Sequence, residues 1–152
     1  MIAERLQGTW ELIESTSQRP DGSTFYPMGE DVRGLISYTS DGYVQVNLMR
    51  PGRPRHGGPQ ITAADPADPA LSEIVRGYMA YAGRFRVDEA AGVVHHDFEL
   101  ALDPNLIGTP QVREITFLSD NEIELAATAG NADGTTRRSR LLWRRTGQSG
   151  GK

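Results

Sequence analysis

Short segments in which apolar and polar residues alternate run through most of the chain, and each ends at a cluster of Gly, Asp, Asn or Pro. Alternation with a period of two residues, in segments rich in branched and aromatic side chains, is typical of β-strands. The pattern predicts eight strands, at residues 6–14, 34–39, 42–49, 83–88, 93–100, 111–118, 122–128 and 138–145. Most neighbours are joined by short turns such as Ser40-Asp41-Gly42, so we expect consecutive antiparallel hairpins. Eight such strands remove their exposed edges by closing into a barrel, whose interior has room for one small ligand.

Two segments depart from this pattern. Residues 50–69 are rich in Pro and Gly and have no periodic apolar positions, which indicates a loop or lid. Asp68 and Pro69 then suit the start of a helix that ends at Gly83. Its apolar residues recur on one helical face, and they are Leu71, Ile74, Val75, Tyr78 and Met79. A helix this short needs a packing partner, so we expect it to cover one end or the outer wall of the sheet.

Composition and charge narrow the class of protein. A length of 152 residues fits one domain, and a net charge of −4 with interspersed signs favours neither nucleic acid nor a membrane surface as partner. The absence of Cys excludes disulfides and thiolate chemistry. No segment has the apolar length of a signal peptide or a membrane span, so a cytoplasmic protein is expected. Arg supplies all but one of the 16 basic residues, which is typical of a GC-rich bacterial gene.

Several blocks of sequence resemble a known family. Gly8-Thr9-Trp10 resembles the Gly-x-Trp signature of lipocalins, in which the Trp plugs the closed end of the barrel and a basic residue of the last strand covers it. Arg144 or Arg145 suits that second role. The blocks LQGTWELIES, GLISYTSDGYVQVNLMRPGRP, YMAYAGRFRVDE, VVHHDFELALDPNLIGTPQVR and LLWRR are similar, in this order, to the bacterial and fungal lipocalin-like domain family.

The resemblance carries expectations for fold and function. It implies an eight-stranded antiparallel up-and-down lipocalin-like barrel with one covering α-helix at residues 1–146. The polar, Gly-rich end of the chain separately predicts a disordered tail at 147–152. Leu106 stands where an aromatic residue is expected, which alters one pocket wall. Relatives occur beside enzymes that make polyketide-like natural products, and some lipocalin-type proteins act as cyclases or isomerases on hydrophobic intermediates.

The predicted strand at residues 93–100 supplies the first candidate for chemistry. Its more apolar face holds Val94, His96, Phe98 and Leu100, so this face is expected inside, with His95 outside. A turn centred near Asn105 and Leu106 would place Arg113, on the next strand, opposite Phe98 and diagonal to His96. An imidazole beside a guanidinium has a lowered pKa and can serve as a base, while the Arg binds a carboxylate or a developing enolate. The alternative is that His96 is structural and that Arg113 pairs with Glu99 or Glu114.

Further polar and aromatic residues are candidates to contact a ligand. Tyr38 and Tyr81 offer a flat ring with one hydroxyl donor and are the candidate acids of a catalytic reaction. On the strand at 42–49 either face can point inward, and the polar face would contribute Tyr43, Gln45 and Asn47. The remaining candidate ligand contacts are Phe98, Asn105, Leu106 and Phe117.

Metal and cofactor chemistry is not expected. His95 and His96 are adjacent and face opposite sides of a strand, so they cannot chelate one ion. We expect a barrel that binds a small, largely hydrophobic or aromatic molecule, and we leave open whether it also converts that molecule without a cofactor, by cyclisation or isomerisation. One alternative is a non-catalytic carrier or sensor of lipocalin type, and another is an interaction module whose barrel is filled by its own side chains. The oligomeric state is left open.

Overall fold

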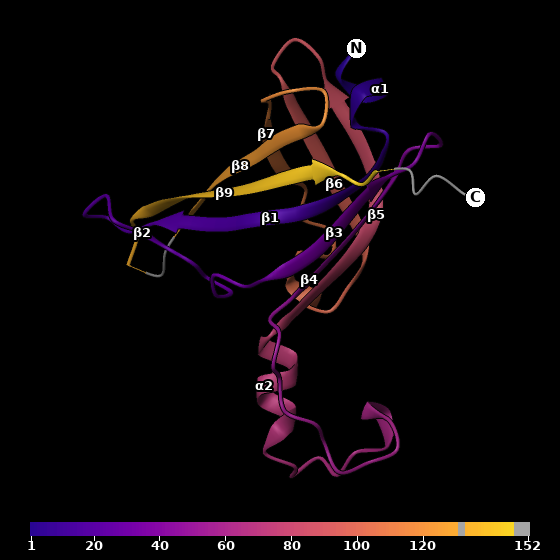
Figure 1. Cartoon of the computed structure of the whole chain (residues 1–152), viewed down its shortest axis with the longest axis vertical. Coiled ribbons are helices and arrows are strands. Elements are labelled where there is room, and N and C mark those ends of the chain that lie inside the picture. The colour runs from indigo at the N-terminus through magenta and orange to yellow at the C-terminus, as the bar shows by residue number, and fades with distance from the viewer. Residues whose placement is uncertain (131–132, 148–152) are drawn as a thin grey trace.

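Eight antiparallel strands close into a barrel in the computed structural model, which describes residues 1–130 and 133–147 (Figure 1). They are β1 (Gly8–Gln18), β3 (Arg33–Tyr38), β4 (Tyr43–Met49), β5 (Tyr78–Asp88), β6 (Val93–Ala101), β7 (Gln111–Phe117), β8 (Glu122–Gly130) and β9 (Thr136–Arg145). Each strand pairs with the next, and β9 returns to β1 from Trp10↔Arg145 to Ser17↔Ser139. A two-residue strand, β2 (Thr24–Phe25), extends the sheet beside the end of β1. The predicted antiparallel barrel is therefore confirmed, while the tail from residue 148 onward lies outside the described residues.

The helix predicted from Asp68 to Gly83 is shorter than expected. The helix α2 spans Ala70–Arg76, and β5 begins at Tyr78, where Tyr78 pairs with Met49 of β4. Tyr78 and Met79 fit a helical face by spacing, yet hydrogen bonding to β4 over seven residue pairs holds them in a strand. The Asp68 carboxylate accepts a hydrogen bond from the Ala70 N–H at 2.9 Å, so it does satisfy one free N–H at the helix start.

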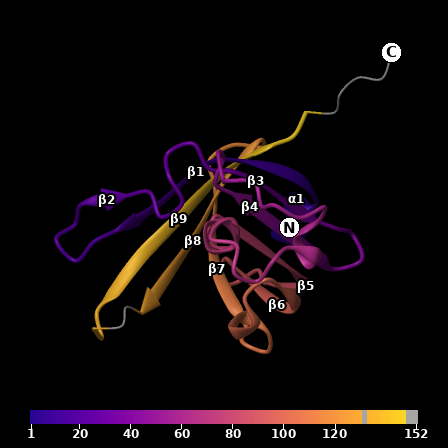
Figure 2. The ribbon, with the colours of Figure 1, turned by 90° about the horizontal axis from the view of Figure 1, so that it is seen from below.

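The two helices mark opposite ends of the barrel. At one end, which we call the closed end, α1 (Ile2–Leu6) packs the fully buried Leu6 against the core. At the other, the open end, α2 and the loop of residues 50–69 project away from the strands (Figure 1), and Figure 2 views the molecule from this end. No side chain of α2 is buried. A third short element, the 3-10 helix η2 (Pro104–Leu106), lies between β6 and β7.

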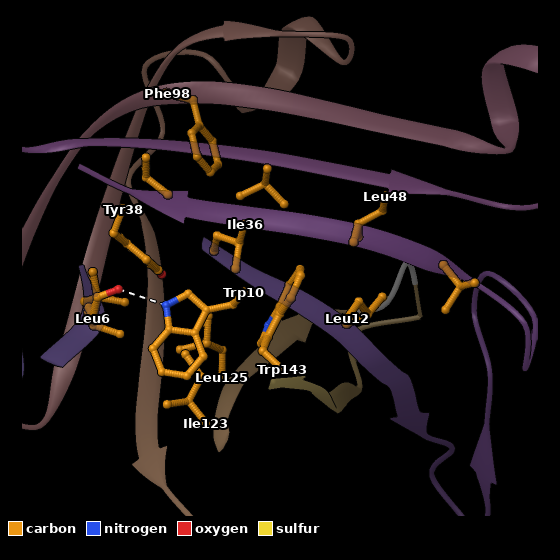
Figure 3. Close-up of a cluster of buried hydrophobic side chains, with 14 of the residues drawn as sticks. Leu6, Trp10, Leu12, Ile36, Tyr38, Leu48, Phe98, Ile123, Leu125 and Trp143 are labelled. Carbon is orange, nitrogen blue, oxygen red and sulfur yellow. Dashed lines mark hydrogen bonds between the residues drawn. The ribbon is translucent and has the colours of Figure 1, made fainter. Parts of the chain in front are cut away.

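The closed end is organised around Trp10, as Figure 3 shows. This indole is fully buried, and its Nε1–H donates to the Leu6 carbonyl at 2.8 Å. The guanidinium of Arg145 lies 4.0 Å from the centre of the Trp10 ring and donates to the carbonyls of Gln7 and Arg5, each at 2.7 Å. Of the two arginines predicted to cover the Trp, Arg145 takes the role, and Arg144 pairs instead with Glu122.

An irregularity between β5 and β6 redirects the end of β6. Gly83 pairs with Phe98 and Ala82 with Leu100, so Glu99 is an extra residue in the ladder. Phe98 is buried, whereas Leu100 is 70% exposed. The prediction that Leu100 faces the interior is wrong, because the extra residue shifts the alternation by one position.

We expect Gly83→Ala to destabilise the protein by about 2 kcal/mol, because a methyl group at this position would overlap the Asp97 carbonyl oxygen across the bulge. Chemical denaturation of the variant measures this loss. Gly57→Ala is the matched control, since a Cβ there meets only an ordinary contact 3.7 Å away. Equal stability of the two variants would contradict the expectation.

Candidate functional site

Tyr38 and His96 form a buried polar pair inside the barrel. β3 turns Tyr38 inward together with Ile36, and β6 turns His96 inward between Val94 and Phe98. The Tyr38 hydroxyl lies 2.9 Å from His96 Nε2, and the two side chains are only about 2% exposed. Phe85, on β5, packs edge-on against the Tyr38 ring with centroids 4.9 Å apart. The predicted inward orientation of His96 is thus confirmed.

The surroundings hold this pair neutral. Burial, with smaller contributions from the charges of Arg113 and His95, lowers the pKa of His96 to about 3. Burial likewise raises the pKa of the Tyr38 hydroxyl above its ordinary value. Near neutral pH the pair is therefore an uncharged hydroxyl bonded to an uncharged imidazole.

Tyr81 and Phe98 lie between this pair and the open end. The two rings are 4.2 Å apart at their centroids, and Phe98 also packs against His96 with centroids 5.6 Å apart. Burial raises the pKa of the Tyr81 hydroxyl, and the positive charge of Arg113 opposes that rise. Within the described part of the chain the Tyr81 hydroxyl has no hydrogen-bonding partner, so it is free to bond a ligand.

Arg113 faces the same interior. It alternates with Ile115 and Phe117, both of which pack against the core, and the outward side chains between them are more exposed. The register differs from the predicted one: Arg113 is opposite Val94, and His96 is opposite Gln111. The connection between β6 and β7 is longer than a tight turn at Asn105 and Leu106. Because Val94 is two residues before His96 on the same face, Arg113 still lies diagonal to His96.

The carboxylates proposed as partners for Arg113 are not close to it. Glu114 pairs with Arg138 on the outer face through two hydrogen bonds, and Glu99 is exposed. Across residues 1–130 and 133–147, no carboxylate oxygen lies within ion-pair distance of the Arg113 guanidinium, which donates a hydrogen bond to the Val112 carbonyl at 3.0 Å. The alternative of an Arg113 ion pair with Glu99 or Glu114 is therefore wrong.

A cavity of about 430 Å³ opens at the end of the barrel where α2 and η2 lie. Met79, Tyr81 and Leu106 form its inner wall, and all three pack against the hydrophobic core. Val75 and Arg76 of α2 contribute its rim. Its volume is within the range of about 300–1,000 Å³ that is usual for small-molecule sites.

Three residues predicted to contact a ligand lie outside the barrel. On β4, Val44, Val46 and Leu48 are buried, which turns Tyr43, Gln45 and Asn47 outward. The prediction that these three side chains point into the barrel is wrong, because the apolar face of β4 fills the interior instead. Tyr43 packs under Arg84, and Asn47 accepts a hydrogen bond from the Tyr78 hydroxyl at 2.9 Å.

The last three predicted ligand contacts are dispersed. Leu106 lines the open-end cavity. Its neighbour Asn105 is exposed, with its N–H bonded to the Asp103 carboxylate. Phe117 lies at the closed end, where the guanidinium of Arg5 covers its ring at 3.7 Å. Sequence reasoning missed Met79 as a wall residue, although its alternation with Tyr81 was a usable strand signal.

Trp143 adds an interior polar group that the sequence did not single out. The side chain is 1% exposed, and its Nε1–H is buried without a hydrogen-bonding partner in the described part of the chain. Within the same residues, no cluster of three or more His, Asp or Glu side chains could hold a metal ion. None of the helices described is long and apolar enough to cross a membrane.

A closed antiparallel barrel, a tryptophan plug under an arginine and a cavity at the opposite end together define a lipocalin-like protein. The profile of the family described as "Lipocalin-like domain" matches residues 7–146, and the chain belongs to this family.

One curated relative is the "4'-hydroxy-3'-methoxypropiophenone carrier protein ppsC" of Aspergillus oryzae, which is 33% identical over 109 residues, or 67% of this chain and 96% of the relative. Among solved structures, bovine odorant binding protein in complex with a selenium-containing odorant has 12% identity and a TM-score of 0.48, over 95% of this chain and 73% of that one. A de novo designed fluorescence-activating β-barrel has 14% identity and a TM-score of 0.42, over 95% and 96% of the two chains.

Proposed function

We propose that this protein is a carrier that binds a small aromatic molecule, bearing a phenol or carbonyl oxygen, in the barrel interior. The observation that carries the proposal is the open-end cavity, whose inner wall of Met79, Tyr81 and Leu106 packs against the hydrophobic core. Within the described part of the chain the Tyr81 hydroxyl has no hydrogen-bonding partner, and Arg113, on the inward face of β7, has no carboxylate partner. A few convergent polar groups in an apolar pocket are typical of a site that orients a ligand.

The relative from Aspergillus oryzae supports this ligand class. Its name assigns it an aryl ketone with one phenolic hydroxyl, 4'-hydroxy-3'-methoxypropiophenone. Such a molecule has a flat ring to pack beside Tyr81 and Phe98 and three oxygen atoms, of the ketone, methoxy and hydroxyl groups, that can accept hydrogen bonds. We propose that this chain, too, binds an aryl ketone and that it carries this ligand without converting it.

Catalysis by His96 is the second candidate, and the Tyr38–His96 hydrogen bond is what favours it. In that reaction His96 would take a proton, Arg113 would hold the developing anion, and Tyr38 or Tyr81 would donate. A general base works best when its pKa is near the operating pH. Since burial lowers the pKa of His96 to about 3, the imidazole is a weak base, and we place carriage first.

We expect Leu106→Trp to weaken binding of 4'-hydroxy-3'-methoxypropiophenone at least about 10-fold, because the larger side chain fills the cavity beside Met79 and Tyr81. Quenching of tryptophan fluorescence or calorimetry measures the affinity. Ile107→Trp is the matched control, since Ile107 is 47% exposed and does not line the cavity.

Two results would contradict the proposal. Equal affinity of the two tryptophan variants would show that the ligand does not enter this cavity. Conversion of the bound ligand to a product that His96→Gln no longer forms would establish the catalytic alternative, whereas recovery of the ligand unchanged supports carriage.

A further inference from the structure

We propose that the barrel binds its aromatic ligand as an anion, with Arg113 as the counter-ion. The inference rests on the proposed function, which supplies an aromatic ligand with an ionisable oxygen. Beyond that function, the inference specifies that the ligand is bound as an anion and that Arg113 is the residue that favours this charge state. Phenols acidified by a ring ketone, and aromatic carboxylic acids, are the classes of ligand that meet this requirement.

The first support is the position of Arg113 itself. The side chain is half-buried on the inward face of β7, diagonal to His96, and its positive charge reaches Tyr38 and Tyr81 on the other walls. A guanidinium stays protonated in proteins, so it cannot escape the cost of burial by losing a proton. A half-buried cation without a carboxylate partner is stabilised further when an anion binds beside it.

The second support is that, among the described residues, the neighbouring strands of the barrel turn no carboxylate toward the interior. On β6 the inward titratable group is His96, which is neutral because burial lowers its pKa. The inward titratable groups of β3 and β5 are Tyr38 and Tyr81, which are also neutral because burial raises the pKa of each hydroxyl. β8 turns Ile123 and Leu125 inward.

The carboxylates of the strands on either side point away from the interior. Glu114 and Glu124 lie on the outer face and pair with arginines of β9. Asp97, on β6, alternates with the buried His96 and Phe98 and so lies on the outer side of that strand, and Glu99, the extra residue of the bulge, is exposed. On β9 itself, Arg145 is bound to backbone carbonyls at the closed end, and Arg137 is exposed at the open end.

The physical consequence concerns both affinity and proton release. A phenolate or carboxylate can accept two charge-assisted hydrogen bonds from one guanidinium, and the Tyr81 hydroxyl can donate a further one. A nearby opposite charge lowers the pKa of an acid, typically by about 1 to 3 units. Binding should therefore remove the phenolic proton of the ligand and release it to solvent at a pH where the free phenol is still protonated.

The test uses two probes that differ in one methyl group: 4'-hydroxy-3'-methoxypropiophenone and its O-methyl ether, which has no acidic proton. We expect the wild-type protein to bind the phenol about 10- to 100-fold more tightly than the ether at a pH above the phenol's own pKa. Phenolates of aryl ketones absorb at longer wavelength than the phenols, so the bound charge state is read from the absorption spectrum. The spectrum should show phenolate about 1 to 2 pH units below the pKa of the free phenol.

Variants then assign the effect to one side chain. Arg113→Gln should abolish the spectral shift and the preference over the ether, and Arg113→Lys should restore much of both, because it keeps the charge. Arg86→Gln is the control, since Arg86 is exposed on the outer face of β5 and loses the same charge. The comparison of the two probes on the wild-type protein needs no variant, so it holds even if Arg113→Gln fails to fold.

The outcomes separate the inference from the function on which it rests. Equal affinity for phenol and ether above the phenol's pKa, with no bound phenolate in the spectrum below that pKa, overturns binding as an anion while carriage stands. If neither probe binds, the proposed function fails for aryl ketones, and the inference fails with it. Phenolate retained on Arg113→Gln and lost on Arg86→Gln would overturn the assignment to Arg113.

Discussion

Replacing Trp10 by Ala is expected to lower the free energy of unfolding by about 3–5 kcal/mol, because truncating a buried aromatic side chain removes apolar contact and leaves a cavity. Trp10 is fully buried against the core, and the substitution also removes the hydrogen bond to the Leu6 carbonyl. It removes the ring on which Arg145 stacks as well. A loss of this size is a large share of the stability of a small domain.

Chemical denaturation measures this loss, with the fluorescence of Trp143 as the probe, since Trp143 is the second Trp of the chain and is buried in the folded protein. Tyr26→Ala serves as the control, because Tyr26 is 38% exposed and should cost little. A Trp10→Ala protein within about 1 kcal/mol of the wild type would refute the role of this residue as the plug of the closed end.

The second large effect is a pH dependence of stability that arises from His96. The pKa of His96 is lowered from an ordinary 6.5 to about 3 in the folded protein, chiefly by burial. The folded state therefore binds the proton less readily than the unfolded chain, so His96 contributes its full stability above pH 6.5 and loses it as the pH falls toward 3. Between pH 7 and pH 4 the wild-type protein should lose about 3 kcal/mol through this residue.

The His96→Gln variant isolates this contribution, because Gln does not titrate and can still bond the Tyr38 hydroxyl. We expect the unfolding free energy of the wild type, relative to that of the variant, to fall by about 3 kcal/mol between pH 7 and pH 4. Carboxylates with a lowered pKa, such as Glu89 and Asp68, also lose stability in acid, but they do so equally in both proteins. Parallel pH profiles for the two proteins would contradict the burial of a neutral imidazole.

Local sequence pattern alone predicted the strands, their antiparallel order and the closure of the barrel. It also predicted the inward direction of His96 and, from the resemblance, the stacking of an arginine on Trp10. These features depend on residues close together in the chain: alternation decides which side chains share a face, and a short turn decides which strands pair. For this reason β6 is predicted correctly from Val93 to Phe98, before the bulge, and not at Leu100 beyond it.

Only the tertiary structure decided how the faces and registers meet. The choice of the apolar face of β4 for the interior depends on what the other walls leave to be filled, and Tyr43, Gln45 and Asn47 lie outside for that reason. The strand rather than helix at Tyr78 depends on hydrogen bonds to β4, a segment about thirty residues away. That no carboxylate of the described residues pairs with Arg113 depends on the facing strands, which turn Tyr38, Tyr81 and His96 toward the interior instead. Alternation along a strand sets the two faces of each segment, but which partner fills or neutralises a face is determined by segments distant in sequence, and a local pattern holds no information about them.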